Sequence, residues 1–216
     1  MMRNAAGFTL IEVLVAMTVM AVMAMMAWQG VDGIVRARDA NQVRLEQTLR
    51  LNSVIGQWEQ DLASIQDTGL VQAFACDGST VRLTRRAEGG MQVVAWALRP
   101  DASASSWWRW ASPIVTTVGD LQDSWLRTQQ FQGGEPGQLR ALEGLSAWQV
   151  YSYRAEWANC QSTGNVTPVS PAPSSPTGQI PPSAAQDIPR GVRIVLSFAP
   201  GSGQNGMLTR DYLLTP

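Results

Sequence analysis

An almost unbroken run of apolar side chains, from Phe8 to Trp28, constrains this chain more than any other feature of its sequence. About 21 residues at about 1.5 Å per residue form a helix of about 31 Å, enough to cross the hydrocarbon core of a bilayer. A secretory signal peptide has a shorter apolar stretch, followed by a cleavage site of small residues. Here the small residue Gly7 precedes the stretch, so cleavage beside it would leave the membrane segment on the mature chain.

One carboxylate, Glu12, lies near the start of this otherwise uncharged span. An acidic residue at the centre of a membrane helix costs about 2.5–3.5 kcal/mol on insertion scales, so we expect Glu12 to have a partner. Cleavage after Gly7 would create a new amine on Phe8, four residues before Glu12. The start of a helix also favours an acidic side chain. When helices pack side by side with a stagger, the amine of a neighbouring copy could pair with Glu12.

The segment Gly7–Ala16, GFTLIEVLVA, resembles the cleavage and methylation motif of type IV prepilins, which type IV pilins and type II secretion pseudopilins share. The resemblance implies cleavage between Gly7 and Phe8 by a prepilin peptidase, followed by N-methylation of Phe8. It also implies that Glu12 neutralises the N-terminal amine of an adjacent subunit during assembly. The alternative is a plain signal anchor in which the glutamate occurs by chance.

Beyond Trp28 the helical pattern continues and becomes amphipathic, to about residue 66. Its apolar stripe has steps of four, three, four and three residues, which is helical spacing, and consists of Leu51, Ile55, Trp58, Leu62 and Ile65. This face packs either on the protein's own head or in a bundle with partner helices.

Past Gly69 the pattern changes from helix to strand. Residues 80–84 and 91–98 flank Glu88-Gly89-Gly90, which indicates a β-hairpin. Further strands are expected at 147–155, 192–198 and 207–214, and a short helix is expected from Asp120 to Gln130, with its cap near Asp120. The predicted fold class is α+β: a long N-terminal helix packed on a β-rich head of antiparallel sheet.

The domain organisation follows from these elements. Residues 1–7 are the expected leader, 8–29 the transmembrane helix, and 30–216 one periplasmic head that includes the helix to about residue 66. A segment at about 163–189 is dense in Pro, Ser, Thr and Gly, and is predicted to be a mobile insertion because it lacks the apolar content to fold alone.

Composition argues against most enzyme classes. The chain has no histidine, which removes the usual general base and a common metal ligand. The net charge of −1 offers no cationic face for nucleic acid. No nucleophile motif or metal cluster is recognisable, so we expect a non-enzyme with no cofactor and no metal site, although a membrane-anchored enzyme is one alternative.

Two further groups of residues are candidates. Cys76 and Cys160 form either a disulfide, which would close a loop of about 85 residues and stabilise by about 4–5 kcal/mol in the chain-entropy model, or a pair of buried thiols. Trp107, Trp108 and Trp110 form either an exposed contact patch, for exported proteins or sugars, or half-buried aromatics of a strand or loop.

The head resembles the J-type minor pseudopilins of type II secretion systems. The resembling segments are residues 58–62 (WEQDL), 142–151 (LEGLSAWQVY), 188–196 (IPRGVRIVL) and 208–214 (LTRDYLL). The resemblance implies a single-pass protein of the bacterial inner membrane with a periplasmic head. Its implied partners are the prepilin peptidase, the I- and K-type minor pseudopilins and the major pseudopilin, and its implied place is the pseudopilus tip. The nearest alternative is a minor pilin that initiates a type IV pilus.

Overall fold

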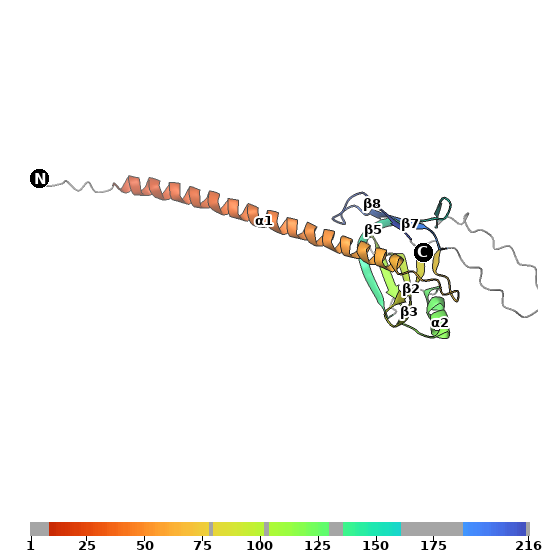
Figure 1. Cartoon of the computed structure of the whole chain (residues 1–216). Helices are drawn as coiled ribbons and strands as arrows, with labels where there is room; N and C mark the ends of the chain where they lie inside the picture. Colours follow the sequence, from red (N-terminus) through yellow and green to blue (C-terminus); the bar gives the residue numbers. More distant parts are fainter. Residues whose placement is uncertain (1–8, 78–79, 102–103, 130–135, 161–187, 215–216) are drawn as a thin grey trace, which may run out of the picture. The chain divides into compact units, whose positions relative to one another are not determined.

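The structure is a computed structural model that describes residues 9–77, 80–101, 104–129, 136–160 and 188–214 (Figure 1). The chain divides into two compact units, Met1–Leu49 and Arg50–Pro216. Gly7 and Phe8, and with them the predicted leader and nearly all of the predicted insertion, lie outside the described residues. The predicted domain boundaries therefore stay predictions.

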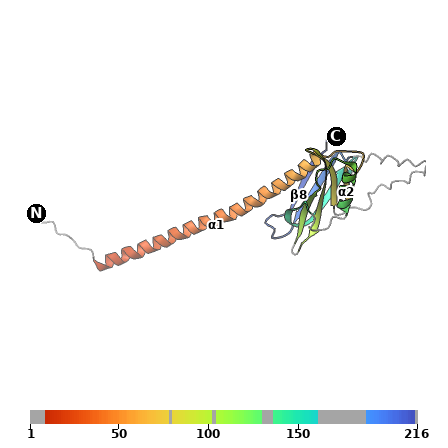
Figure 2. The same cartoon turned by 90° about the horizontal axis from the view of Figure 1, so that it is seen from below.

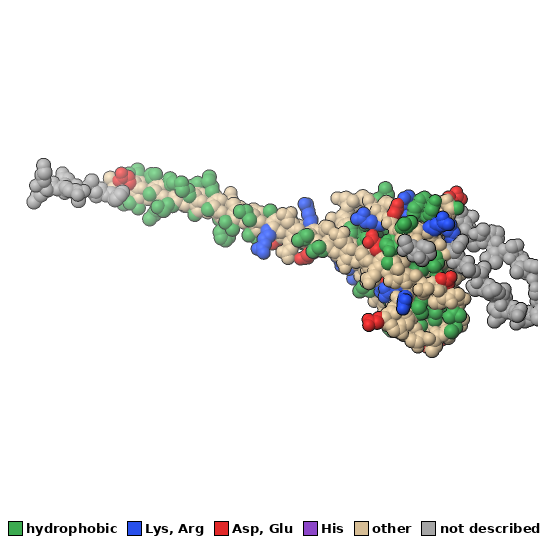
Figure 3. Space-filling view, in the orientation of Figure 1, with side chains coloured by type: hydrophobic (Ala, Val, Ile, Leu, Met, Phe, Trp, Pro, Cys, Tyr) green, Lys and Arg blue, Asp and Glu red, His purple; other side chains and the backbone are tan. Residues whose placement is uncertain are grey.

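Helix α1 is a single element of 54 residues, Leu10–Ala63, that runs through Gly30 and Gly33 without a break. It is long and apolar enough near its N-terminus to cross a membrane, and none of its most apolar stretch is buried. Figure 3 shows hydrophobic side chains covering this first part of α1. The helix ends three residues earlier than expected.

The head is built on one antiparallel sheet with the strand order β1-β2-β3-β4-β5-β7-β8, and the short strand β6 pairs with β5. Its strands are β1 Phe74–Asp77, β2 Thr80–Ala87, β3 Gly90–Pro100, β4 Ser105–Ala111, β5 Gln138–Tyr153, β6 Trp157–Asn159, β7 Gly191–Phe198 and β8 Met207–Leu213. A second helix, α2, spans Val118–Gln129. A long N-terminal apolar helix followed by an antiparallel β-sheet head confirms the predicted α+β, pilin-like fold class.

Two hydrophobic clusters hold the head together. In the larger one, Trp58 and Leu62 from the last turns of α1 pack among side chains of six strands. In the smaller one, Leu121 and Trp125 of α2 pack on β3 and β4. Successive side chains of a strand point to opposite faces, and β3 alternates between the two clusters, so the sheet is covered on both faces here. Figures 1 and 2 show α2 against the sheet.

The hairpin prediction is confirmed. Strands β2 and β3 pair from Thr80↔Ala97 to Ala87↔Gly90. Gly89 has a φ of 88°, which a non-glycine residue rarely adopts, and so it fits the tight turn.

Helix α2 is capped three residues before Asp120, near which the cap was expected. Thr117 precedes the helix: its Oγ1 accepts from the Asp120 backbone N–H at 3.2 Å and donates to Asp120 Oδ2 at 2.6 Å. Because Thr117 is the cap, Asp120 occupies the third helical position, where an acidic side chain favours the helix start.

Candidate functional site

The start of α1 is closed by a reciprocal pair of side chains, Thr9 and Glu12. The Thr9 backbone N–H and its hydroxyl donate to Glu12 Oε2 at 2.9 and 2.8 Å, while the Glu12 backbone N–H lies 3.4 Å from Thr9 Oγ1. This is a capping box, in which a threonine and the acidic residue three positions later satisfy each other's free backbone N–H groups. The Thr-x-x-Glu spacing was visible in the sequence, but our prediction considered only the charge of Glu12.

The capping box leaves room for a second partner of Glu12. Both hydrogen bonds from Thr9 reach the same carboxylate oxygen, Oε2, and the side chain is exposed. A carboxylate has about four lone-pair sites on two oxygens, so Oε1 keeps its capacity to accept from a cationic donor. Cleavage between Gly7 and Phe8 would preserve the Thr9 N–H. The geometry therefore accommodates the capping role and a docking role together.

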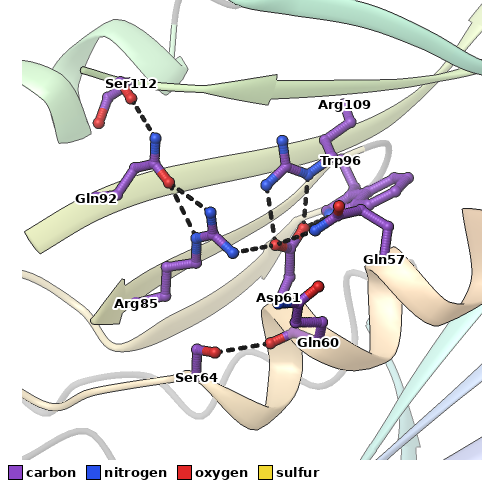
Figure 4. Close-up of polar contacts among 9 residues, drawn as sticks. All are labelled: Gln57, Gln60, Asp61, Ser64, Arg85, Gln92, Trp96, Arg109 and Ser112. Carbon is purple, nitrogen blue, oxygen red and sulfur yellow. Dashed lines mark hydrogen bonds and ion pairs between the residues drawn. The ribbon is translucent and has the colours of Figure 1, made fainter. Parts of the chain in front are cut away.

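At the other end of α1 a second polar cluster joins the helix to the sheet (Figure 4). The Asp61 carboxylate is 0% exposed. It accepts from Arg109 Nε at 2.7 Å and Nη2 at 2.9 Å, from Arg85 Nη1 at 2.8 Å, and from the Trp96 indole N–H at 2.9 Å. These donors come from β2, β3 and β4, so one side chain of α1 contacts three adjacent strands.

The Asp61 cluster carries an excess of positive charge. One carboxylate faces two guanidiniums, whose side chains are 18% exposed for Arg85 and 13% for Arg109. Burial lowers the pKa of Arg85, the Asp61 carboxylate raises it and Arg109 lowers it, with a net shift downward. Arg85 also donates to Gln92 Oε1 at 3.0 and 2.6 Å, and the Gln92 amide donates to the Ser112 carbonyl at 2.6 Å. The neutral Gln92 amide thus binds the Arg85 guanidinium, while Asp61 and Arg109 form the closest ion pair.

Sequence reasoning missed this cluster. Asp61 lies on the apolar stripe of the amphipathic helix, between Trp58 and Leu62, and a charged residue in that position was the available signal. A buried carboxylate requires paired donors. The donors that pair it are 24 and 48 residues away along the chain, so no local pattern identifies them.

Of the two alternatives for Trp107, Trp108 and Trp110, the structure contradicts the exposed contact patch and supports aromatics of a strand. Trp107 is 0% exposed and Trp110 is 3% exposed. All three side chains lie on β4, and alternation places Trp107 in the cluster facing α1 and Trp110 in the cluster facing α2. Trp108 is half-buried, with the Arg99 guanidinium 5.8 Å from its ring centre. A sheet covered on both faces cannot present the three rings together.

The structure brings the two cysteines together as free thiols. Cys76 lies on β1 and Cys160 directly follows β6, and both are half-buried against the cluster facing α1. The two side chains are hydrogen-bonded to each other. Whether they become a disulfide stays a prediction.

Comparison with known proteins bears on the first segment of the chain. Residues 2–28 match the family model described as Prokaryotic N-terminal methylation motif. A search of the curated proteins finds no match. The matched residues contain the predicted cleavage site and Glu12, and this motif implies processing by a prepilin peptidase and pilin-like assembly. Within the described part of the chain, one helix is apolar and long enough to cross a membrane, which suggests a single-pass membrane anchor. The methylation motif, on a chain with this helix-and-sheet architecture, therefore supports a type IV pilin-like protein.

Proposed function

We propose that this chain is a minor pseudopilin of a type II secretion system, of the J type. It assembles at the tip of the periplasmic pseudopilus with the I- and K-type minor pseudopilins and the major pseudopilin, and initiates assembly for protein export. The observation that carries the proposal is the start of α1, where the methylation motif places Glu12 four residues after the expected new N-terminus.

The J-type assignment draws support from where the resembling segments lie. Residues 58–62 form the last turns of α1 and include both Trp58 and the buried Asp61. Residues 142–151 lie in β5, and the two C-terminal segments supply most of β7 and β8. These are packing elements of the head, so the resemblance concerns its core rather than its loops.

The proposed mechanism is mechanical and involves no catalysis by this chain. The apolar part of α1 holds the subunit in the inner membrane, with the head in the periplasm. During assembly the N-methylated amine of Phe8 in an adjacent subunit pairs with Glu12 Oε1, while Thr9 keeps Oε2. An unpaired charge is costly in hydrocarbon. A helix is therefore most stable at the position where the Phe8 amine of one subunit meets Glu12 of the next.

Three variants separate docking from capping. Glu12→Ala should leave cleavage at Gly7 intact and impair incorporation into the filament. Glu12→Gln keeps an oxygen that can accept from Thr9 but removes the charge, and is expected to be impaired as well. Thr9→Val removes the hydroxyl and keeps the charge, so it should incorporate. Immunoblots of sheared filaments and of processed membrane protein measure both steps.

The opposite ranking would contradict the docking role. If Thr9→Val fails to incorporate while Glu12→Gln succeeds, the residues serve only to start the helix. The secretion assignment has a separate test, because deletion of the gene should abolish protein export and leave surface pili intact. Loss of pili with normal export would identify a minor pilin instead.

A further inference from the structure

The cysteines come from opposite halves of the head. Cys76 belongs to β1, the strand at one edge of the sheet. Cys160 follows β6, which pairs with β5. Strands β2, β3 and β4 lie between β1 and β5 in the sheet order. Among the described residues, no strand pairing joins β1 to β6. The contact between the two thiols therefore joins two parts of the head that no described strand pairing connects.

We infer that Cys76 and Cys160 form an intramolecular disulfide in the exported protein. The inference rests on the proposed function in one respect: the head must face an oxidising compartment, where disulfides persist. Both side chains pack against the same hydrophobic cluster as the last turns of α1. Both cysteines are therefore held in place by the packed core of the head.

Each of the two sulfurs is the strongest influence on the pKa of the other. Hydrogen bonding from Cys76 lowers the pKa of Cys160, with further help from Ser152 and from the positive charge of Arg154. The same hydrogen bond, together with burial, raises the pKa of Cys76 well above its ordinary value. The two sulfurs therefore influence each other's protonation directly, and the thiolate of either one is the attacking species in disulfide formation.

The reaction balances with an oxidising protein disulfide of the periplasmic thiol oxidase class. The thiolate of one cysteine attacks one sulfur of that disulfide, forms a mixed disulfide and releases the oxidant's other sulfur as a thiolate. The second cysteine then loses its proton and attacks the sulfur of the first, which expels the oxidant as a dithiol after protonation. The head loses two protons and two electrons, and the oxidant gains both.

The bond would stabilise two short strands of the head, β1 and β6. Strand β1 has four residues and is an edge strand, and β6 has three. Short edge strands have few hydrogen bonds to hold them. The disulfide would tie both to the sheet and constrain the unfolded chain over a long loop.

The test uses the full chain in membranes of the cells that make it. Thiols are blocked with an alkylating reagent before lysis, and the protein is digested without reduction and analysed by mass spectrometry. The expected result is one linked peptide pair containing Cys76 and Cys160, lighter than the two free peptides by two hydrogen atoms and separated by reduction. Alkylation of both cysteines in the non-reduced sample would overturn the inference.

A second measurement shows which premise failed in that case. Purified, reduced protein in detergent is exposed to oxidised glutathione. Rapid bond formation would place the fault in the compartment, and hence in the proposed function, whereas no bond formation would place it in the geometry of the head. Cleavage at Gly7 tests the proposed function independently of either result.

Discussion

Replacing Asp61 by asparagine should destabilise the head more than any other polar substitution in it. The carboxylate is fully buried and accepts from two guanidiniums and an indole N–H. Asparagine has nearly the same shape but no charge, so the two arginines would face each other without a counter-charge.

The magnitude follows from this geometry. Removing one partner of a buried ion pair costs about 3–5 kcal/mol, because it leaves an uncompensated charge. The arginine side chains are less than one-fifth exposed, so water screens them only in part. We expect the lower end of that range, about 3 kcal/mol, because the amide oxygen still accepts one hydrogen bond. Domains are stable by about 5–15 kcal/mol in all, so the loss is a large fraction.

The two arginine variants predict an ordering. Arg85→Gln leaves a neutral pair, Asp61 with Arg109, which retains its two hydrogen bonds. Arg109→Gln removes the closer pair and leaves Arg85 as the only cation at Asp61. The destabilisation should therefore decrease from Asp61→Asn through Arg109→Gln to Arg85→Gln.

Denaturant titration of the full chain in a non-ionic detergent measures these differences. Tryptophan fluorescence reports on the cluster directly, because the Trp96 ring contacts Trp58 and Trp107 at centroid distances of 5.6 and 4.4 Å. Asp123→Asn is the control, since Asp123 is exposed on α2 and its substitution should change stability by about 0.5 kcal/mol or less. An Asp61→Asn variant within about 1 kcal/mol of wild type would refute the argument, because breaking a buried pair costs more than that.

Three further predictions concern the head. Trp96→Phe should cost about 1–2 kcal/mol more than Trp107→Phe, because both remove similar volume but only the Trp96 indole N–H has a hydrogen-bond partner; denaturant titration measures the difference. Gly90→Ala should destabilise by about 1–3 kcal/mol, since its Cβ would lie 2.4 Å from a backbone oxygen, whereas Gly119→Ala meets nothing within 4 Å and should be neutral or slightly stabilising in thermal melts. A hydrogen bond from Arg193 of β7 lowers the pKa of Asp211. The stabilising effect of the Asp211 carboxylate is therefore present above its unfolded pKa and is lost as the pH falls through the lower folded pKa. In denaturant titrations, Asp211→Asn should differ in stability from wild type at neutral pH and converge with it in acid.

Local patterns predicted most of the secondary structure. The hairpin was accessible because a glycine turn between two β-rich runs depends on residues next to each other in sequence. The long helix was accessible because its apolar run and its later stripe both have helical spacing. The Thr9–Glu12 capping box was equally local, although our prediction considered only the charge of Glu12.

Features that depend on long-range contacts were not accessible. The tryptophans of β4 are buried because α1 and α2 cover opposite faces of the sheet, which the strand itself does not reveal. Asp61 finds its donors on three strands whose pairing order is set by the whole sheet. Cys76 and Cys160 could be paired by count, but their contact depends on the fold of the whole head, because β1 and β6 are not paired with each other.

The most direct test of the pilin-like account is the intact mass of the protein purified from membranes, with and without a co-expressed prepilin peptidase. The account predicts a chain that begins at N-methylated Phe8 only when the peptidase is present, with Glu12 retained four residues from the new amine. An unprocessed chain in both samples, or cleavage after Trp28, would contradict it, because Glu12 would then lack the amine that the proposed assembly requires.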